Sequence, residues 1–221
     1  TSQTRPEKIN LVFHQVFNKD AVSNLEALVK PAKGLDVIVP TWFSVNDVSG
    51  TISSIATEEY VKKANDLGLE VWGLVDDFNT DVSMHELLSY TSRRETLSNT
   101  LVEAALKYKL NGINIDFEKI SSDTGIHFIQ FLRELSVKCR NNGIVLSVDN
   151  YVPMPYTAYY DREEQGKIVD YVITMAYDEY HAGSEVAGPV ASIGFVKDAV
   201  KNTLAEVPKE KTIIAIPFYT R

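Results

Sequence analysis

Short apolar segments that favour strands alternate along this chain with longer segments that favour helices. Most of the strand-like segments are nearly continuous apolar runs, which is typical of parallel strands covered on both faces. The seven predicted strands are residues 9–17, 35–45, 69–78, 112–118, 144–151, 170–178 and 212–219. Apolar residues recur at helical spacing in residues 57–67, 93–108, 122–140 and about 193–205. Repeated strand–helix order predicts an α/β fold.

Two α/β architectures agree with this order: an open, doubly wound sheet and a closed barrel of eight parallel strands. The open form often binds nucleotides through a glycine-rich turn, but neither G-x-G-x-x-G nor G-x-x-x-x-G-K-[ST] follows any predicted strand. A closed barrel needs one strand more than the seven predicted here. With 221 residues and no linker or low-complexity segment, the whole chain, 1–221, is predicted to be one domain.

Charge and the distribution of reactive residues exclude several classes of function. The formal net charge of −8 argues against a nucleic acid or an anionic membrane surface as partner. No apolar run approaches the roughly 18 residues of a membrane span. The four histidines show neither H-x-x-x-H nor H-E-x-x-H, and no G-x-S-x-G is present, so we predict no metal site, no cofactor and no serine nucleophile. Cys139 stands alone, at helical spacing from Ile129 and Leu132, and is predicted to be buried.

The stretch from Leu110 to Glu118 alternates strictly between apolar and polar residues. Successive side chains of a strand point to opposite faces, so Asn114, Asp116 and Glu118 are predicted to share one face and Ile113, Ile115 and Phe117 the other. In a barrel of parallel strands, polar groups at this carboxyl end are where chemistry takes place. An edge strand with a solvated polar face would show the same alternation.

Acidic and aromatic residues gather at or near the carboxyl ends of the predicted strands. The acids are Asp76, Asp116, Glu118, Asp149 and Asp178, and the aromatics are Trp42, Phe43, Tyr151, Tyr177 and Tyr219. Aromatic rings stack on the apolar faces of sugars, and carboxylates transfer protons to a glycosidic oxygen, so the set favours a carbohydrate site. Each residue taken alone could instead be a helix cap or part of the core.

Three motifs resemble those of glycoside hydrolase family 18, the chitinase-like family. N-G-I-N-I-D-F-E at 111–118 is similar to the family's D-G-x-D-x-D-x-E, M-A-Y-D at 175–178 to its M-x-Y-D, and I-P-F-Y-T-R at 216–221 to its P-x-Y-x-R. The resemblance implies a (β/α)8 barrel that, in this chain, lacks its eighth strand after Arg221. V-P-T-W-F-S-V at 39–45 further resembles bacterial enzymes that cut spore-cortex or cell-wall peptidoglycan, which implies an extracellular, cell-wall or spore-associated location.

The resemblance also implies an activity: retaining cleavage of β-1,4 linkages beside N-acetylglucosamine, in peptidoglycan or chitin, with help from the substrate's own acetamido group. Glu118 would protonate the leaving oxygen, Asp116 would orient the acetamido N–H, and Tyr177 would bind the acetamido oxygen. The remaining predicted substrate-binding residues are Asn114, Met175, Asp178, Asp149, Tyr151, Trp42, Tyr219 and Arg221.

This sequence departs from the family pattern at two acids. Asn111 and Asn114 stand where the signature has its first and second Asp. The second Asp normally partners the third, here Asp116, and an asparagine neither ionises nor shares a proton in the same way. We therefore expect a shifted pH optimum. A carbohydrate-binding protein without turnover is the alternative, and the presence of Glu118 favours an enzyme.

Overall fold

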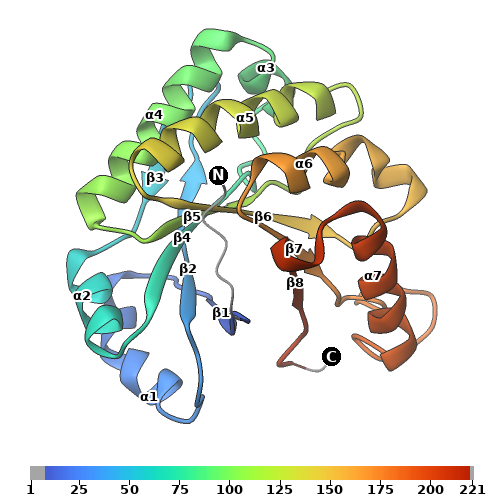
Figure 1. Ribbon diagram of the computed structural model, residues 1–221, viewed down its shortest axis with the longest axis horizontal. Coiled ribbons are helices and arrows are strands. Elements are labelled where there is room, and N and C mark those ends of the chain that lie inside the picture. Colours follow the sequence, from blue (N-terminus) through green and yellow to red (C-terminus); the bar gives the residue numbers. More distant parts are fainter. Residues whose placement is uncertain (1–7, 220–221) are drawn as a thin grey trace.

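The computed structural model describes residues 8–219, and its centre is a curled sheet of parallel strands (Figure 1). The strands are β1 (Leu11–His14), β2 (Val37–Val45), β3 (Ile52–Ser54), β4 (Glu70–Asp76), β5 (Gly112–Asp116), β6 (Val145–Tyr151), β7 (Tyr171–Met175) and β8 (Thr212–Ala215). Their hydrogen-bonded order is β1-β2-β4-β5-β6-β7-β8, every neighbouring pair is parallel, and the short β3 pairs antiparallel with β2.

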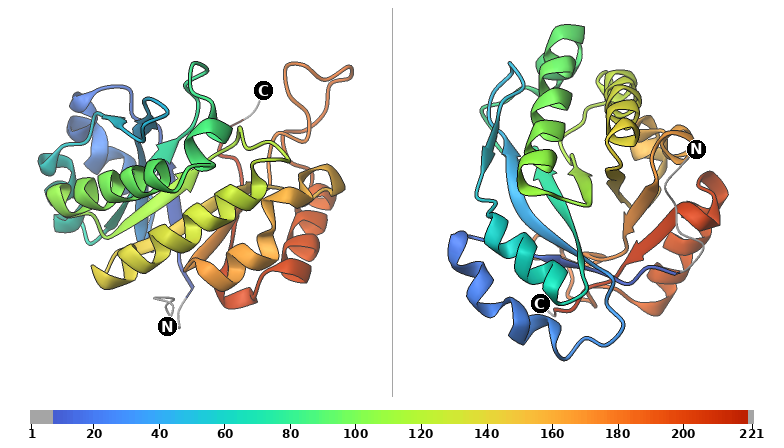
Figure 2. Two further views of the ribbon diagram at one scale, coloured as in Figure 1. Left: turned by 90° about the horizontal axis from the view of Figure 1, so that it is seen from above. Right: turned by 60° about the vertical axis from the view of Figure 1, so that its left-hand side comes forward.

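Helices follow the strands and cover the outside of the curl, as the two further views show (Figure 2). The α-helices are α1 (Leu25–Val29), α2 (Glu58–Asp66), α3 (Met84–Leu88), α4 (Thr91–Tyr108), α5 (Gly125–Asn141), α6 (Arg162–Ile168) and α7 (Ile193–Glu206). Three 3-10 helices, η1 (Lys19–Asn24), η2 (Pro155–Tyr160) and η3 (Lys209–Lys211), complete the connections. In the part of the chain that the structure describes, no helix has both the length and the hydropathy to cross a membrane.

All seven predicted strands and all four predicted helices are present, so the α/β class is confirmed. The seven parallel strands curl as in the barrels of related folds, whereas closure of the barrel and the place of an eighth strand stay predictions. The predicted carboxyl ends of three strands were wrong, because each of these strands ends earlier in the chain than predicted. β5 ends at Asp116, β7 at Met175 and β8 at Ala215, so Glu118, Tyr177 and Tyr219 follow their strands instead of lying on them.

Two apolar layers form on the two faces of the sheet. The larger layer packs the outer face against the helices and includes Ile113, Ile115 and Phe117. The smaller one fills the inside of the curl around Trp72 and Tyr171, whose rings stack at 5.5 Å between centroids. Trp72 also explains the glycine that opens β5, because a Cβ on Gly112 would lie 2.5 Å from the indole ring.

Candidate active site

The alternation of β5 divides its side chains as predicted. Phe117 packs on the outer face against Phe128 and Phe131 of α5, with ring centroids 5.9 Å away in both cases. Asn114 and Asp116 are buried and belong to neither apolar layer. The outer-face packing therefore fixes the polar residues of β5 on the inner face of the curl.

Glu118 lies two residues beyond β5 and is partly buried. The hydroxyl of Tyr151, the last residue of β6, donates a hydrogen bond to Glu118 Oε2 at 2.6 Å. Asp116, Glu118 and Asp149 are called the acidic cluster below. Tyr151 is 41% exposed, so its contact with Glu118 lies at the rim of this cluster and within reach of a ligand. The structure thus joins two of the predicted site residues directly.

Asn114 links the polar face of β5 to β6. Its side-chain amide donates to Ser147 Oγ and to Asp149 Oδ1, both at 2.9 Å. Asp149 is only 3% exposed and accepts its hydrogen bond from Asn114. The predicted contact between Asp149 and a sugar stays a prediction. Within residues 8–219, two fully buried side-chain oxygens have no hydrogen-bond partner: Oδ1 of Asn114 and Oδ1 of Asp116.

Burial and mutual repulsion make these acids hard to ionise. Burial is the largest cause that raises the pKa of Asp116, and the charges of Asp149 and Glu118 raise it further. Burial also raises the pKa of Asp149, although the hydrogen bond from Asn114 opposes this. Because the charge of one carboxyl opposes ionisation of the other, the pair keeps a proton at pH values well above the usual pKa of aspartate. A protonated carboxyl can donate a hydrogen bond as well as accept one.

Tyr177 belongs to the same cluster. Burial raises the pKa of its phenol far above the ordinary value, followed by the charges of Asp149, Asp116 and Glu118. Tyr177 follows β7 two residues beyond Met175, at the same edge of the sheet at which Glu118 follows β5. That residues 116, 118 and 177 converge on one sugar stays a prediction of the motifs.

The remaining predicted residues around β7 form a second small group. Tyr219 donates to Asp178 Oδ1 at 2.9 Å and packs edge-on against Tyr177, with 6.3 Å between ring centroids. Asp178 has φ of 58°, the left-handed region, which turns the chain sharply after Tyr177. Met175 ends β7 and is paired in register with Tyr151. Arg221 lies outside the described residues.

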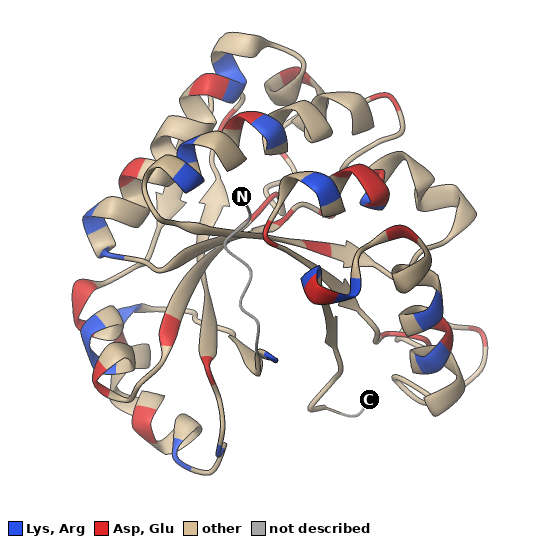
Figure 3. Cartoon of the chain, in the orientation of Figure 1, with Lys and Arg blue, Asp and Glu red and all other residues tan. Residues whose placement is uncertain are grey.

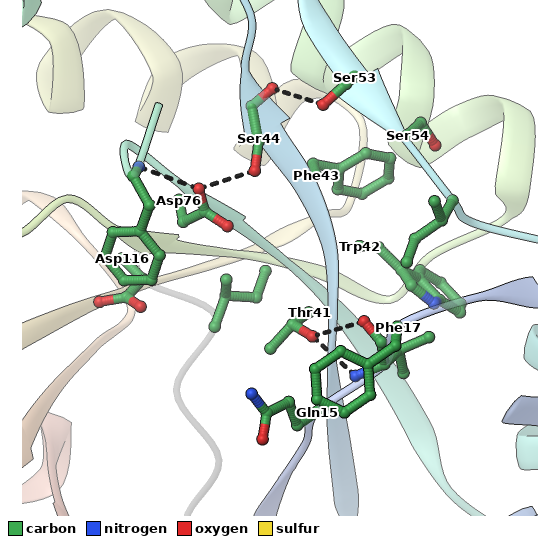
Figure 4. A pocket seen from close by; sticks show the side chains of 14 residues that line it. Gln15, Phe17, Thr41, Trp42, Phe43, Ser44, Ser53, Ser54, Asp76 and Asp116 are labelled. Atoms are coloured by element: carbon green, nitrogen blue, oxygen red, sulfur yellow. Dashed lines mark hydrogen bonds between the residues drawn. The ribbon is translucent and has the colours of Figure 1, made fainter. Parts of the chain in front are cut away.

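A pocket of about 380 Å³ opens beside Asp116 (Figure 4). Its lining includes Gln15 and Phe17 after β1, Trp42 and Ser44 of β2, and Asp76 of β4. Ser44 donates to Asp76 Oδ1 at 2.7 Å, which ties β2 to β4 at the pocket wall.

Trp42 lines this pocket with little of its surface. Only 3% of the residue is exposed, and its ring packs edge-on against Tyr60 with 4.7 Å between centroids. Trp42 therefore offers the pocket a small edge instead of a broad platform, since the indole is taken up by the core. Phe17 is 80% exposed at the same pocket and was missed, because it follows the end of β1 and no motif marks it.

The charge distribution agrees better with an uncharged ligand than with a polyanion. Lys and Arg, blue in Figure 3, lie mainly on the outer helices. Among the described residues, no group of His, Cys, Asp and Glu has the arrangement of a metal site.

A curled parallel sheet with carboxyls and phenols at the carboxyl ends of its strands resembles the α/β-barrel class, in which that end of the sheet carries the site. The model of the glycosyl hydrolases family 18 matches residues 13–221, so this chain belongs to that family, as its three motifs predicted.

Two relatives by sequence come from Bacillus subtilis (strain 168). A predicted sporulation-specific glycosylase of Bacillus subtilis (strain 168), YdhD, is 35% identical over 149 residues, which are 64% of this chain and 34% of the relative. The cortical fragment-lytic enzyme of the same organism is 28% identical over 139 residues, 60% of this chain and 32% of the relative. The chain thus corresponds to about a third of the length of these two relatives.

Solved structures share the fold. The crystal structure of YdhD superposes with a TM-score of 0.77 at 27% identity, covering 83% of this chain and 64% of that one. The C-terminal domain of a predicted chitinase from Desulfitobacterium hafniense DCB-2 gives a TM-score of 0.84 at 21% identity, covering 96% of this chain and 66% of that one.

Proposed function

We propose that this chain is the catalytic domain of a retaining glycosidase that cleaves β-1,4 linkages next to N-acetylglucosamine. The observation that carries the proposal is the hydrogen bond of 2.6 Å from Tyr151 to Glu118, which lies two residues beyond Asp116 at the carboxyl end of β5. Glu118 is partly open to solvent, whereas Asp116 and Asp149 are buried. A group in that position can reach a ligand and exchange a proton with it.

The geometry supports substrate-assisted catalysis. Glu118 gives its proton to the glycosidic oxygen, the substrate's acetamido oxygen attacks the anomeric carbon, and a cyclic oxazolinium forms as the aglycone leaves. Asp116, whose buried Oδ1 has no partner within residues 8–219, accepts the acetamido N–H. Tyr177 donates its phenol to the acetamido oxygen. Ionised Glu118 then takes a proton from water, which opens the oxazolinium with net retention of the anomeric configuration.

Peptidoglycan is the preferred substrate in this proposal and chitin the second. The support is the set of relatives, whose names refer to sporulation and to cortical fragments. The same relatives support a cell-wall or spore-associated place of action. Both polymers present the acetamido group that the proposed mechanism needs, so the site residues act in the same way on either.

The test is Glu118→Gln, which keeps the shape of the side chain and removes its proton. We expect release of a chromogenic aglycone from an N-acetylglucosamine oligomer to fall by at least about 10³-fold, since this substitution removes acid and base catalysis together. Oligomer binding, measured by calorimetry, is expected to survive. Glu103→Gln, on the exposed face of α4, is the matched control and should keep full turnover.

Two outcomes would redirect the proposal. A Glu118→Gln protein with most of its turnover would remove Glu118 from the role. A wild-type protein that binds the oligomer and releases no aglycone from either polymer would favour the alternative of a carbohydrate-binding protein.

A further inference from the structure

The segment that carries Glu118 leaves the sheet just before that residue. The β4–β5 ladder ends where Asp76 pairs with Asp116, so Phe117, Glu118 and Lys119 have no strand beside them. Backbone N–H and C=O groups that have no partner in the ladder need other hydrogen-bond partners. Without them the segment could move and displace the side chain of Glu118. What replaces the ladder therefore sets the position of the general acid.

A single buried side chain accepts the backbone hydrogen bonds that the ladder no longer provides. Asp77, the next residue after β4, accepts the backbone N–H of Glu118 on Oδ1 at 2.9 Å and that of Lys119 on Oδ2 at 2.8 Å. Asp77 is 1% exposed, so water does not compete for these two bonds. Hydrogen bonds to a carboxylate are also stronger than those between neutral groups.

Two further contacts hold the same segment from its other sides. Tyr160 of η2 donates its hydroxyl to the carbonyl of Phe117 at 2.8 Å. Lys119 Nζ donates to the carbonyl of Phe78 at 2.7 Å. Of the groups involved, only Asp77 contacts the main chain of Glu118 itself.

We propose that Asp77 is the positioning residue of the general acid: its two carboxylate oxygens fix the main chain of residues 118 and 119 and so hold the Glu118 carboxyl beneath the hydroxyl of Tyr151. This inference rests on the proposed role of Glu118. Two neighbouring N–H groups need two acceptors side by side, which a carboxylate has and an amide lacks. Asparagine at this position would bring an N–H₂ group against one of the two backbone donors.

The experiment compares Asp77→Asn with wild type in turnover of a chromogenic N-acetylglucosamine oligomer. We expect kcat to fall roughly 10²-fold with KM within about threefold, because a small displacement of a catalytic group has effects of this size and binding of the sugar elsewhere is unaffected. If Asp77→Asn fails to fold by circular dichroism, Asp77→Ser is measured in the same way, since it leaves room for water between the two N–H groups.

The matched control is Asp170→Asn. Asp170 is also a buried carboxylate that accepts a backbone N–H, that of Leu146 at 2.9 Å, but it lies at the opposite end of the sheet, before β7. Its substitution should lower the thermal midpoint and leave kcat within twofold. Equal losses of kcat in Asp77→Asn and Asp170→Asn would mean that Asp77 acts only on stability, which overturns the inference.

A second measurement separates this inference from the proposed function. Amide hydrogen exchange at residues 118 and 119 should be at least tenfold faster in Asp77→Asn than in wild type and unchanged in Asp170→Asn. Unchanged exchange in Asp77→Asn overturns the anchoring of this segment. If wild type turns over no oligomer, the proposed function fails, while the exchange rates still decide whether Asp77 anchors the segment.

Discussion

Asn114 and Asp149, on the neighbouring strands β5 and β6, are joined by a buried hydrogen bond of 2.9 Å from the side-chain amide to Oδ1. Asn114 stands where the family signature has an acid. The amide removes one ionisable group from a place where Asp116 and Asp149 already repel each other, and it gives Asp149 a donor. With the amide in place, β5 contributes one buried carboxyl, Asp116, and β6 contributes another, Asp149.

Restoring the family's acid by Asn114→Asp should destabilise the protein. The new carboxylate would face two groups that now accept from the amide, Asp149 Oδ1 and Ser147 Oγ. We expect the free energy of unfolding to fall by about 1–3 kcal/mol at pH 8 and by less at pH 5, where a protonated carboxyl can donate. Urea unfolding at both pH values measures this. Asn202→Asp on the exposed side of α7 is the control, and a loss that is the same at pH 5 and pH 8 would contradict the explanation.

The acidic cluster should also make the native state less stable as the pH rises. The folded-state pKa of Asp116 is raised above the unfolded value, chiefly by burial, so the folded protein resists its ionisation. The resulting destabilisation is absent below the unfolded pKa of about 4 and complete above the folded pKa.

Asp116→Asn removes that cost. We expect this variant to be more stable than wild type at pH 8, by on the order of 1 kcal/mol, and no more stable at pH 4. Turnover should fall at the same time, since residues that serve a site are often unfavourable for stability. Chemical denaturation at the two pH values is the measurement, and a variant that is less stable than wild type at pH 8 would refute the prediction.

Tyr151 should assist Glu118 without controlling the affinity for sugar. Its hydroxyl donates to Glu118 Oε2, and Tyr151→Phe removes that bond while keeping the ring. We expect kcat to fall roughly tenfold with KM nearly unchanged, as for the loss of one hydrogen bond to a charged group. Tyr156→Phe, on the same connection and 75% exposed, should match wild type. An increase in KM alone would show that Tyr151 binds substrate and does not orient Glu118.

Local patterns in the sequence predicted most of the scaffold and part of the site. The strict alternation of 112–117 assigned each side chain of β5 to its face, because one face packs against α5 and the other does not. The motifs predict that residues 116, 118 and 177 act together, and they identified the family. The short elements β3, α1, α3 and α6 were missed, since three to seven residues carry too little periodicity to recognise.

Contacts between distant residues could not be predicted in this way. Asp77 bonds to the main chain of Glu118, 41 residues further along, and nothing in the segment around Asp77 indicates that partner. Its neighbour Asp76 was singled out instead, because both acids lie at the end of β4 and only the fold decides which of them bonds to the segment after β5. Trp42 was assigned to the sugar for a similar reason, although Tyr60 and the core surround it.

The glycine of the signature is set by packing on the inner face and should tolerate no side chain. A Cβ on Gly112 would lie 2.5 Å from the ring of Trp72, which is fully buried and stacks on Tyr171, so the ring cannot move away without disturbing the inner core. We expect Gly112→Ala to lower the free energy of unfolding by about 1–3 kcal/mol, the usual cost of overpacking. Gly194→Ala is the matched control, because a Cβ there meets no atom closer than 3.9 Å and alanine suits the first turn of α7. Denaturant titration of both variants is the measurement. A Gly112→Ala protein as stable as Gly194→Ala would show that Trp72 does not fix the path of β5. Near-ultraviolet circular dichroism of the indole would report whether its ring has shifted.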